Sequence, residues 1–217
     1  MSQELDLSLY LITDRKLACG RPMEAVVQEA IDGGITALQL REKHCEGGDF
    51  LKMALRLREI TAEAGIPLII NDRIDVALAA DADGVHLGQT DIPCEYARRL
   101  LGPEAIIGLS VTNVEQARRA QQLDLTYIGV GPIFFTMTKE NGRSPIGFEG
   151  LRAISQESTH RIVAIGGIKR VSVKEAIEQG AEGVAVVSAI MAAADPRIAA
   201  QELLNSVRAA RSSGKQL

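Results

Sequence analysis

Eight short apolar runs recur along the chain, and a segment with helical character follows each of them. Every run is four or five residues long and apolar at most positions, which is typical of parallel strands buried on both faces. Strands that alternate with helices along a whole chain pair in parallel and carry their helices on the outside of the sheet. The predicted strands are Leu9–Thr13, Ala37–Arg41, Leu68–Asn71, Gly84–Leu87, Ile106–Ser110, Tyr127–Val130, Ile162–Ile165 and Gly183–Val187.

The segments between these strands carry helix start and stop signals. Asp49 is the predicted cap of the second helix, Asn113 with Gln116 caps the fifth, and Ser172 with Glu175 caps a later one. Eight strand–helix units predict one (β/α)8 TIM barrel as a single domain over residues 1–217, with a doubly wound open sheet as the alternative. The predicted helices are Met23–Asp32, Phe50–Ala64, one starting near Ile74, Pro93–Leu101, Val114–Gln122, Val173–Gln179 and Ile198–Arg211.

The composition limits the classes of partner. Only 3% of the residues are aromatic and none is Trp, so Ala, Val, Ile and Leu must build the core. The net charge of −4 argues against a nucleic-acid surface. We expect no membrane association, because no apolar run approaches the ~20 residues that a membrane-spanning helix needs. The sequence leaves the oligomeric state open, a homo-oligomer included.

The cysteines and the N-terminus favour a cytoplasmic protein. Cys19, Cys45 and Cys94 are widely spaced and form no CxxC pair, so we expect reduced thiols and neither a zinc site nor a disulfide framework. The first residues carry acids before the apolar run and no basic segment, which is unlike a secretory signal peptide.

Polar residues follow the predicted strands, at the end of a barrel where active sites lie. Within Gln39–Lys43, alternation places Gln39, Arg41 and Lys43 on one side of the extended chain. Two cations and an amide suit a polyanion. The alternative is a strand-end salt bridge with Glu42 or a neighbouring acid.

Asp72 and Asp91 are the candidate ligands of a magnesium ion. They follow neighbouring predicted strands, close to the cations of Gln39–Lys43. Magnesium prefers a few carboxylates that are supplemented by water and phosphate oxygens. The alternative is that the two residues cap the helices that start near Ile74 and Pro93.

Three further segments predict phosphate contacts. The loop Gly131–Gly147 is long for a barrel and carries the donors Thr136, Thr138 and Lys139. Gly166–Gly167 follows the seventh strand, and Val186–Ile190 places backbone N–H groups at a short helix start. Phosphate sites recur at these two strand ends of the fold.

The three histidines follow no metal-ligand spacing. His86 falls within a predicted strand, so we interpret it as a hydrogen-bonded core residue rather than a ligand.

These motifs, in this order, resemble the thiamine-phosphate synthase family. The strings that carry the resemblance extend from Tyr10 to Ile190: YLITDR, QLREK, NDRIDVAL, DGVHLGQTD, IGLS, YIGVGPIF, AIGGI and GVAVVSAI. The resemblance implies a TIM barrel that joins an aminomethylpyrimidine diphosphate to a (carboxy)thiazole phosphate and releases pyrophosphate.

The resemblance also assigns the site residue by residue. It implies magnesium at Asp72 and Asp91, and it makes Arg41, Lys43, Ser110 and Lys139 the catalytic candidates. The residues implied for the pyrimidine diphosphate are Gln39, Leu40, Arg41, Glu42, Lys43, Asn71, Ser110 and Lys139. Those implied for the thiazole phosphate are Thr136, Met137, Thr138, Gly167, Val187 and Ser188.

Two positions depart from the family pattern, and three other functions compete. Phe135 stands where proline is usual, and Thr112 stands where a related thiazole tautomerase uses histidine. A tautomerase-like relative is one alternative, and Thr112 together with the metal carboxylates argues against it. A Schiff-base aldolase that uses Lys43 and a non-catalytic phosphate-binding barrel are the others.

Overall fold

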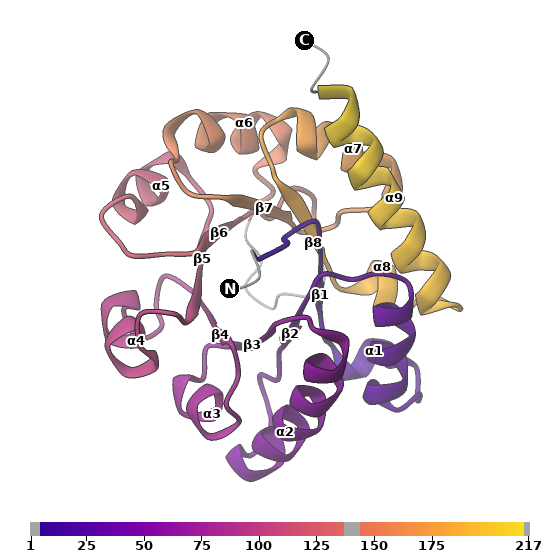
Figure 1. Ribbon diagram of the computed structural model, residues 1–217. Helices are drawn as coiled ribbons and strands as arrows, with labels where there is room; N and C mark the ends of the chain where they lie inside the picture. The colour runs from indigo at the N-terminus through magenta and orange to yellow at the C-terminus, as the bar shows by residue number, and fades with distance from the viewer. Residues whose placement is uncertain (1–4, 137–143, 215–217) are drawn as a thin grey trace.

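The computed structural model describes residues 5–136 and 144–214 as a closed parallel barrel, with its helices on the outside (Figure 1). Hydrogen bonding between the first and last strands closes the ring, so the predicted TIM barrel is confirmed and the open sheet is wrong. No predicted strand end differs from the observed one by more than one residue. The strands are β1 (Leu9–Ile12), β2 (Ala37–Leu40), β3 (Leu68–Asn71), β4 (Gly84–Leu87), β5 (Ile106–Val111), β6 (Tyr127–Val130), β7 (Ile162–Ile165) and β8 (Gly183–Val186).

The helices follow the strands in order. The short helix start predicted within Val186–Ile190 is confirmed by the helix Ser188–Met191, whereas a helix after β6 and the 3-10 turn after β1 went unpredicted. No helix within the described ranges is long and apolar enough to span a membrane. The helices are η1 (Arg15–Ala18), α1 (Met23–Asp32), α2 (Gly47–Ala64), α3 (Ile74–Ala79), α4 (Cys94–Leu101), α5 (Val114–Ala120), α6 (Gly147–Glu157), α7 (Arg170–Glu178), α8 (Ser188–Met191) and α9 (Pro196–Gly214).

Two of the three predicted helix caps are wrong. The cap of α2 is Glu46, which places Asp49 inside the first turn. The helix α7 begins at Arg170, so Ser172 lies in its first turn, where its hydroxyl accepts a 3.0 Å bond from the Lys169 N–H. The third prediction is confirmed, because the side chain of Asn113 accepts a 2.9 Å hydrogen bond from the Gln116 N–H.

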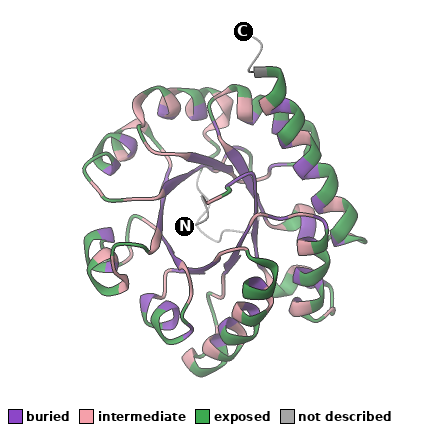
Figure 2. Ribbon diagram, viewed as in Figure 1, coloured by how far each residue is buried: buried purple, intermediate pink, exposed green. Residues whose placement is uncertain are grey.

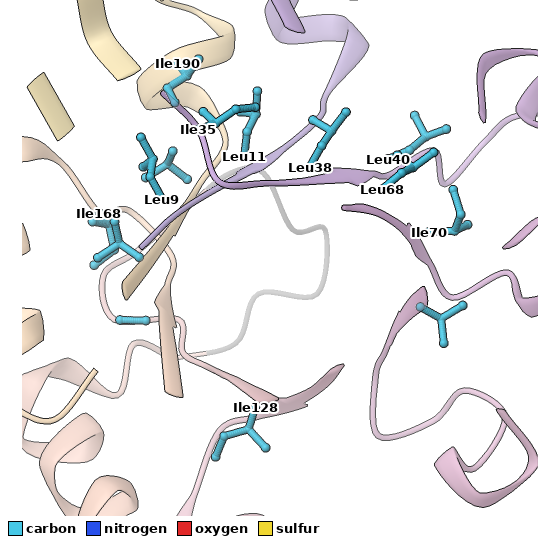
Figure 3. Packing of buried hydrophobic residues seen from close by; sticks show 14 of the residues in the cluster. Leu9, Leu11, Ile35, Leu38, Leu40, Leu68, Ile70, Ile128, Ile168 and Ile190 are labelled. Carbon is cyan, nitrogen blue, oxygen red and sulfur yellow. The ribbon is translucent and has the colours of Figure 1, made fainter. Parts of the chain in front are cut away.

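Two apolar layers hold the barrel together. The larger layer lies between strands and helices, and Figure 3 shows Leu38 and Leu40 of β2 pointing into it, away from the barrel axis. The smaller layer fills the barrel interior and includes Tyr10, Tyr127 and Val163. The strands are therefore buried on both faces, while the helices expose their outer sides (Figure 2). Inward side chains at the strand ends are left to form a site.

Candidate active site

Two adjoining cavities open at the C-terminal ends of the strands. The first has a mainly apolar wall, formed by residues that include Ile12, Ile168 and Val186. The second is lined by charged and polar groups. The residues common to both walls are Arg41, Asn71, His86, Pro132, Thr136 and Ile165.

Most of the site residues predicted from the sequence line one or both cavities. Met137, Thr138 and Lys139 lie outside the described residues. Two other predicted residues, Leu40 and Glu42, do not line either cavity. The predicted residues that do are Gln39, Arg41, Lys43, Asn71, Asp72, Asp91, Ser110, Thr136, Gly167, Val187 and Ser188.

Leu40 and Glu42 point elsewhere because side chains alternate along an extended chain. Leu40 is fully buried in the layer beneath the helices, so only its backbone faces the site. Glu42 accepts a 3.0 Å hydrogen bond from Arg15, while its second carboxylate oxygen is buried without a hydrogen-bond partner. Gln39 lines the first cavity, Lys43 lines the second and Arg41 lines both.

The end of β2 is held by Thr13, a fully buried residue at the end of the neighbouring strand β1. The Thr13 N–H donates to the Gln39 carbonyl at 2.9 Å, and the Thr13 hydroxyl accepts from the Arg41 N–H at 3.0 Å. These two bonds fix the backbone between the amide of Gln39 and the guanidinium of Arg41. Sequence reasoning placed Thr13 at the strand end but gave it no role.

The carboxylates of Asp72 and Asp91 meet at the rim of the second cavity. The backbone of Asp72 is left-handed, with φ of 61°, and its N–H donates to the His86 carbonyl at 2.9 Å. Asp91 accepts a 2.6 Å hydrogen bond from the Gly88 N–H. Neither carboxylate caps a helix, since α3 and α4 begin without a side-chain cap. The capping alternative is therefore wrong.

Electrostatics at this rim favour a bound cation. Burial raises the pKa of the Asp72 carboxyl, a hydrogen bond from Lys43 opposes that rise, and the neighbouring Asp91 adds to it. The ammonium of Lys43 forms an ion pair with Asp72. Two adjacent carboxylates, of which Asp72 pairs with a lysine, have the chemistry of a site for a hard divalent cation. No group of three or more metal-binding side chains occurs within residues 5–136 and 144–214, so water or phosphate oxygens would have to complete the coordination.

A chain of hydrogen bonds crosses the barrel interior beneath the cavities. The Gln39 amide donates to the Tyr10 hydroxyl at 2.9 Å, and this hydroxyl lies 2.9 Å from that of Tyr127. The Tyr127 hydroxyl then lies 2.9 Å from Nδ1 of His86, and Nε2 of His86 lies 2.9 Å from the Ser110 hydroxyl. We call Gln39, Tyr10, Tyr127, His86 and Ser110 the polar relay. The prediction that His86 is a hydrogen-bonded core residue is confirmed.

The glycine turn after β7 forms part of the first cavity. Gly166 and Gly167 have φ of 100° and 65°, and a Cβ added at Gly167 would lie 2.8 Å from the Cβ of Phe134. Only glycine fits this left-handed, crowded turn. Across the cavity, Ser188 begins α8 directly after β8.

Comparison with known proteins identifies the family. The family model described as thiamine monophosphate synthase matches residues 9–190. Thiamine-phosphate synthase from Chloroflexus aurantiacus is 49% identical over 199 residues, which is 92% of each chain. The enzyme of the same name from Albidiferax ferrireducens is 52% identical over 197 residues, covering 91% of this chain and 90% of that protein. The chain belongs to the thiamine monophosphate synthase family.

A solved structure supports this assignment to the thiamine monophosphate synthase family. The structure of thiamine phosphate pyrophosphorylase from Pyrococcus furiosus is 40% identical, with a TM-score of 0.86, and the match covers 95% of this chain and 98% of that one. The family resemblance seen in the sequence motifs is confirmed.

Two residues beneath the site, which sequence reasoning missed, lie inside the barrel. Tyr10 and Tyr127 were placed in strands without a role, although a polar-tipped aromatic residue in an apolar strand is a signal for a buried hydrogen bond. Thr112 lines the second cavity, and its hydroxyl donates to the Gln116 side chain at 3.0 Å. That hydroxyl cannot supply the imidazole that a tautomerase-like relative requires.

Proposed function

We propose that the chain is a magnesium-dependent thiamine-phosphate synthase. It transfers an aminomethylpyrimidine group from its diphosphate to the ring nitrogen of a (carboxy)thiazole phosphate and releases pyrophosphate. The observation that carries this proposal is the pair of adjoining cavities, because a polar, charged cavity and an apolar cavity share one wall. That arrangement suits two small-molecule substrates held side by side.

The diphosphate would bind in the second cavity. Arg41 offers a bidentate fork and Lys43 a point charge for its oxygens, and Asn71 adds an amide. Lys139, outside the described residues, would add another cation, and Leu40 and Glu42 would contribute backbone contacts. Gln39 and Ser110 would hold the pyrimidine ring from opposite sides of the barrel.

The thiazole phosphate would bind against the first cavity. Gly167, Val187 and Ser188 supply a backbone turn and a hydroxyl there. Thr136 stands on the shared wall, and Met137 and Thr138 follow it in the chain. Apolar residues such as Ile168 would cover the thiazole ring.

Asp72 and Asp91 would hold the magnesium ion, whose chemistry is to neutralise charge on the departing pyrophosphate. The raised pKa of Asp72 and the short reach to Asp91 support this role, since a divalent cation relieves both burial and mutual repulsion. When the substrate is bound, Lys43 and Arg41, which line the same cavity, would stabilise the same negative charge.

Positioning and charge stabilisation account for the chemistry. The C–O bond at the pyrimidine methylene breaks early, and its electron pair leaves with the pyrophosphate. The aminopyrimidine ring spreads the positive charge that remains. The thiazole nitrogen, held close by its phosphate, then forms the new C–N bond. The residues of the site need only align these groups and exclude water, so no covalent nucleophile is required.

The test is to mix the two phosphate substrates with the protein, with and without magnesium, and to measure pyrophosphate release. Asp72→Ala and Asp91→Ala should each lower the rate by about 10²-fold or more if they hold the metal. Absence of magnesium-dependent release by the unaltered protein would refute the function. Near-normal rates in both variants would refute only the metal assignment.

Three further points belong to the same proposal. The chain would act as one domain, which the β1–β8 closure supports. It would act in the cytoplasm, in keeping with its three free cysteines. Either a monomer or a homo-oligomer is compatible with the site, because both cavities are lined by one chain.

A further inference from the structure

The polar relay links the two cavities through the inside of the barrel. Gln39 lines the first cavity, Ser110 lines the second, and His86 borders both. The two tyrosines between them are fully buried, and their rings meet edge to face with centroids 5.8 Å apart. The ring of His86 stacks on Tyr127 at 5.5 Å. Packing therefore holds the relay in place independently of its hydrogen bonds.

Each of the four links in the relay contains one hydrogen. A tyrosine hydroxyl donates one hydrogen bond, and a neutral imidazole has one donor and one acceptor nitrogen. Burial raises the pKa of both Tyr10 and Tyr127, which keeps both phenols protonated. If donor and acceptor exchange roles in one hydrogen bond of the relay, they must also exchange roles in the next one. Otherwise two donors or two acceptors would face each other and that hydrogen bond would be lost.

The relay therefore has two complete arrangements. In the first, the Gln39 N–H donates into the relay, so its carbonyl faces the cavity as an acceptor. Hydrogen bonds then run to Nδ1 of His86, Nε2–H donates to Ser110, and the serine hydroxyl donates to the ligand. In the second, every link is reversed, so Gln39 presents its N–H and Ser110 presents a lone pair. In both arrangements one end donates while the other accepts.

We propose that the polar relay selects the pyrimidine substrate by coupling its two ends, so that a ring offering one donor and one acceptor is bound and a ring offering two acceptors is rejected. An aminopyrimidine fits, since its amino group donates and its ring nitrogen accepts. The proposal rests on the proposed function, which places this ring between Gln39 and Ser110. Tyr10, Tyr127 and His86 are then positioning residues.

The coupling can be broken without removing either end. Tyr127→Phe keeps the ring but deletes the central hydroxyl, so Gln39 and Ser110 can adopt their directions independently. Tyr10→Phe deletes the neighbouring hydroxyl of the relay. It is the replacement test if Tyr127→Phe does not fold. Tyr96→Phe is the matched control, because Tyr96 lies on α4, half exposed and outside both cavities.

The probes are two pyrimidine diphosphates of nearly equal size, in which a methylamino or a methoxy group replaces the amino group. The methylamino group retains one N–H donor, whereas the methoxy group offers only lone pairs. Inhibition constants are measured for both against turnover of the aminopyrimidine substrate. Thermal unfolding of each variant reports whether it is folded.

We expect the unaltered protein and Tyr96→Phe to prefer the methylamino probe by about 100-fold, since a site built around hydrogen bonds rejects analogues that leave its groups unpaired. In Tyr127→Phe and Tyr10→Phe this preference should fall by about tenfold or more. In the variant that combines Tyr127→Phe with Tyr10→Phe, the preference should fall no further, because loss of one hydroxyl already uncouples Gln39 from Ser110. A purely structural role would weaken both probes equally.

The ¹⁵N spectrum of the His86 imidazole gives a readout that does not depend on turnover. Binding of the methylamino probe should fix one tautomer in the unaltered protein and leave a mixture in Tyr127→Phe. The chain has three histidines, and the His86 signals are those lost in His86→Gln.

The outcomes separate the two proposals. If the unaltered protein does not turn over the aminopyrimidine substrate, the proposed function fails. If it does, and the probe preference is the same in both folded phenylalanine variants as in Tyr96→Phe, the coupling is overturned.

Discussion

Several features of Asp72 destabilise the folded protein. Its backbone is left-handed, a conformation that asparagine and glycine adopt more easily than aspartate. Its carboxylate is mostly buried, lies beside Asp91, and has a raised pKa despite the ion pair with Lys43. At neutral pH the folded protein therefore holds a charge that is easier to carry in the unfolded chain. Such costs are common where a group is kept for binding rather than for stability.

Asp72→Asn should therefore stabilise the metal-free protein while it removes activity. We expect the free energy of unfolding at pH 7 to rise by on the order of 1 kcal/mol. A raised carboxyl pKa means that protonation favours the fold, so the unaltered protein gains stability as the pH falls through that pKa. The advantage of Asn should shrink over the same range. Urea unfolding at several pH values measures both effects, and a less stable variant at pH 7 would contradict them.

Lys43 places its ammonium beside Asp72, one of the two proposed metal ligands. Its ammonium pairs with Asp72, so a divalent ion at this carboxylate must compete with it. Of the partners that the salt-bridge alternative allowed, the neighbouring acid Asp72 pairs with Lys43, rather than Glu42.

Lys43→Met should tighten metal binding in the absence of substrate. Removal of a partly exposed ion pair worth about 1 kcal/mol predicts roughly fivefold higher affinity for Mn²⁺, measured by titration. Lys52→Met is the control, since Lys52 is exposed and pairs with Asp49 on α2. Turnover should nevertheless fall, because the diphosphate loses a cation. Weaker Mn²⁺ binding in Lys43→Met than in the control would show that the lysine does not compete.

At the scale of elements, β5 and β6 make room for the aromatic interior. A Cβ at Gly108 would lie 2.3 Å from Cζ of Tyr127 and 2.6 Å from Nδ1 of His86. A Cβ at Gly129 would lie 3.0 Å from Cε1 of His86. Large side chains on some strands are thus matched by glycine on the adjacent strand or on the next strand but one, and glycine within a strand marks such a close approach.

Gly108→Ala should therefore be much more damaging than Gly129→Ala. We expect a loss of about 2–3 kcal/mol for the first, which is typical of overpacking a full interior, and less than half of that for the second. Gly48→Ala in the first turn of α2 is the control, since nothing lies within 4 Å of its added Cβ. Denaturant unfolding ranks the three, and equal losses at Gly108 and Gly129 would refute the packing argument.

The strands could be predicted closely because a four-residue apolar run buried on both faces leaves little freedom in where it ends. Helix starts were less predictable. Asp49 and Ser172 are good capping residues, yet each lies in the first turn, since tertiary packing extends the helix beyond the local signal. The helix α6 was missed because Gly147 and Gly150 weaken its pattern, although Gly150 packs closely on Ile146.

The cavity-lining residues were predictable for a similar reason, because polar groups after apolar runs are conspicuous. The polar relay was not, since Tyr10 and Tyr127 are 117 positions apart and meet only across the closed barrel. No local pattern reports such a contact.

At the scale of the whole molecule, the end opposite the site ties the last helix to the first strand. Arg211 of α9 donates to the Glu182 carbonyl and, at 2.8 Å, to the Ser8 hydroxyl. Arg161 pairs with Glu182 and donates to the Leu5 carbonyl at 2.7 Å. These residues precede strands β1, β7 and β8, so they close the barrel at its N-terminal end and leave the C-terminal end to the cavities.

Arg211→Ala should therefore lower stability without changing the chemistry. Loss of charged hydrogen bonds to two partly buried acceptors predicts a decrease of about 2 kcal/mol in the free energy of unfolding. We expect kcat/KM of the folded protein to stay within twofold, because Arg211 lies at the far end of the barrel. Arg208→Ala, at an exposed position on the same helix, should change neither quantity. A large fall in kcat/KM for Arg211→Ala would contradict this separation of the two ends.

The contact between Arg211 and Ser8 has a consequence for how the chain can be rearranged. Ser8 and Arg211 lie at the same rim, beside the seam where β8 meets β1. A linker could join the segment after Arg211 to the segment before Ser8, and a new opening could be cut at the exposed turn between α4 and β5. Such a circular permutant would start its synthesis at β5 and still build the same ring, because a closed barrel has no first strand.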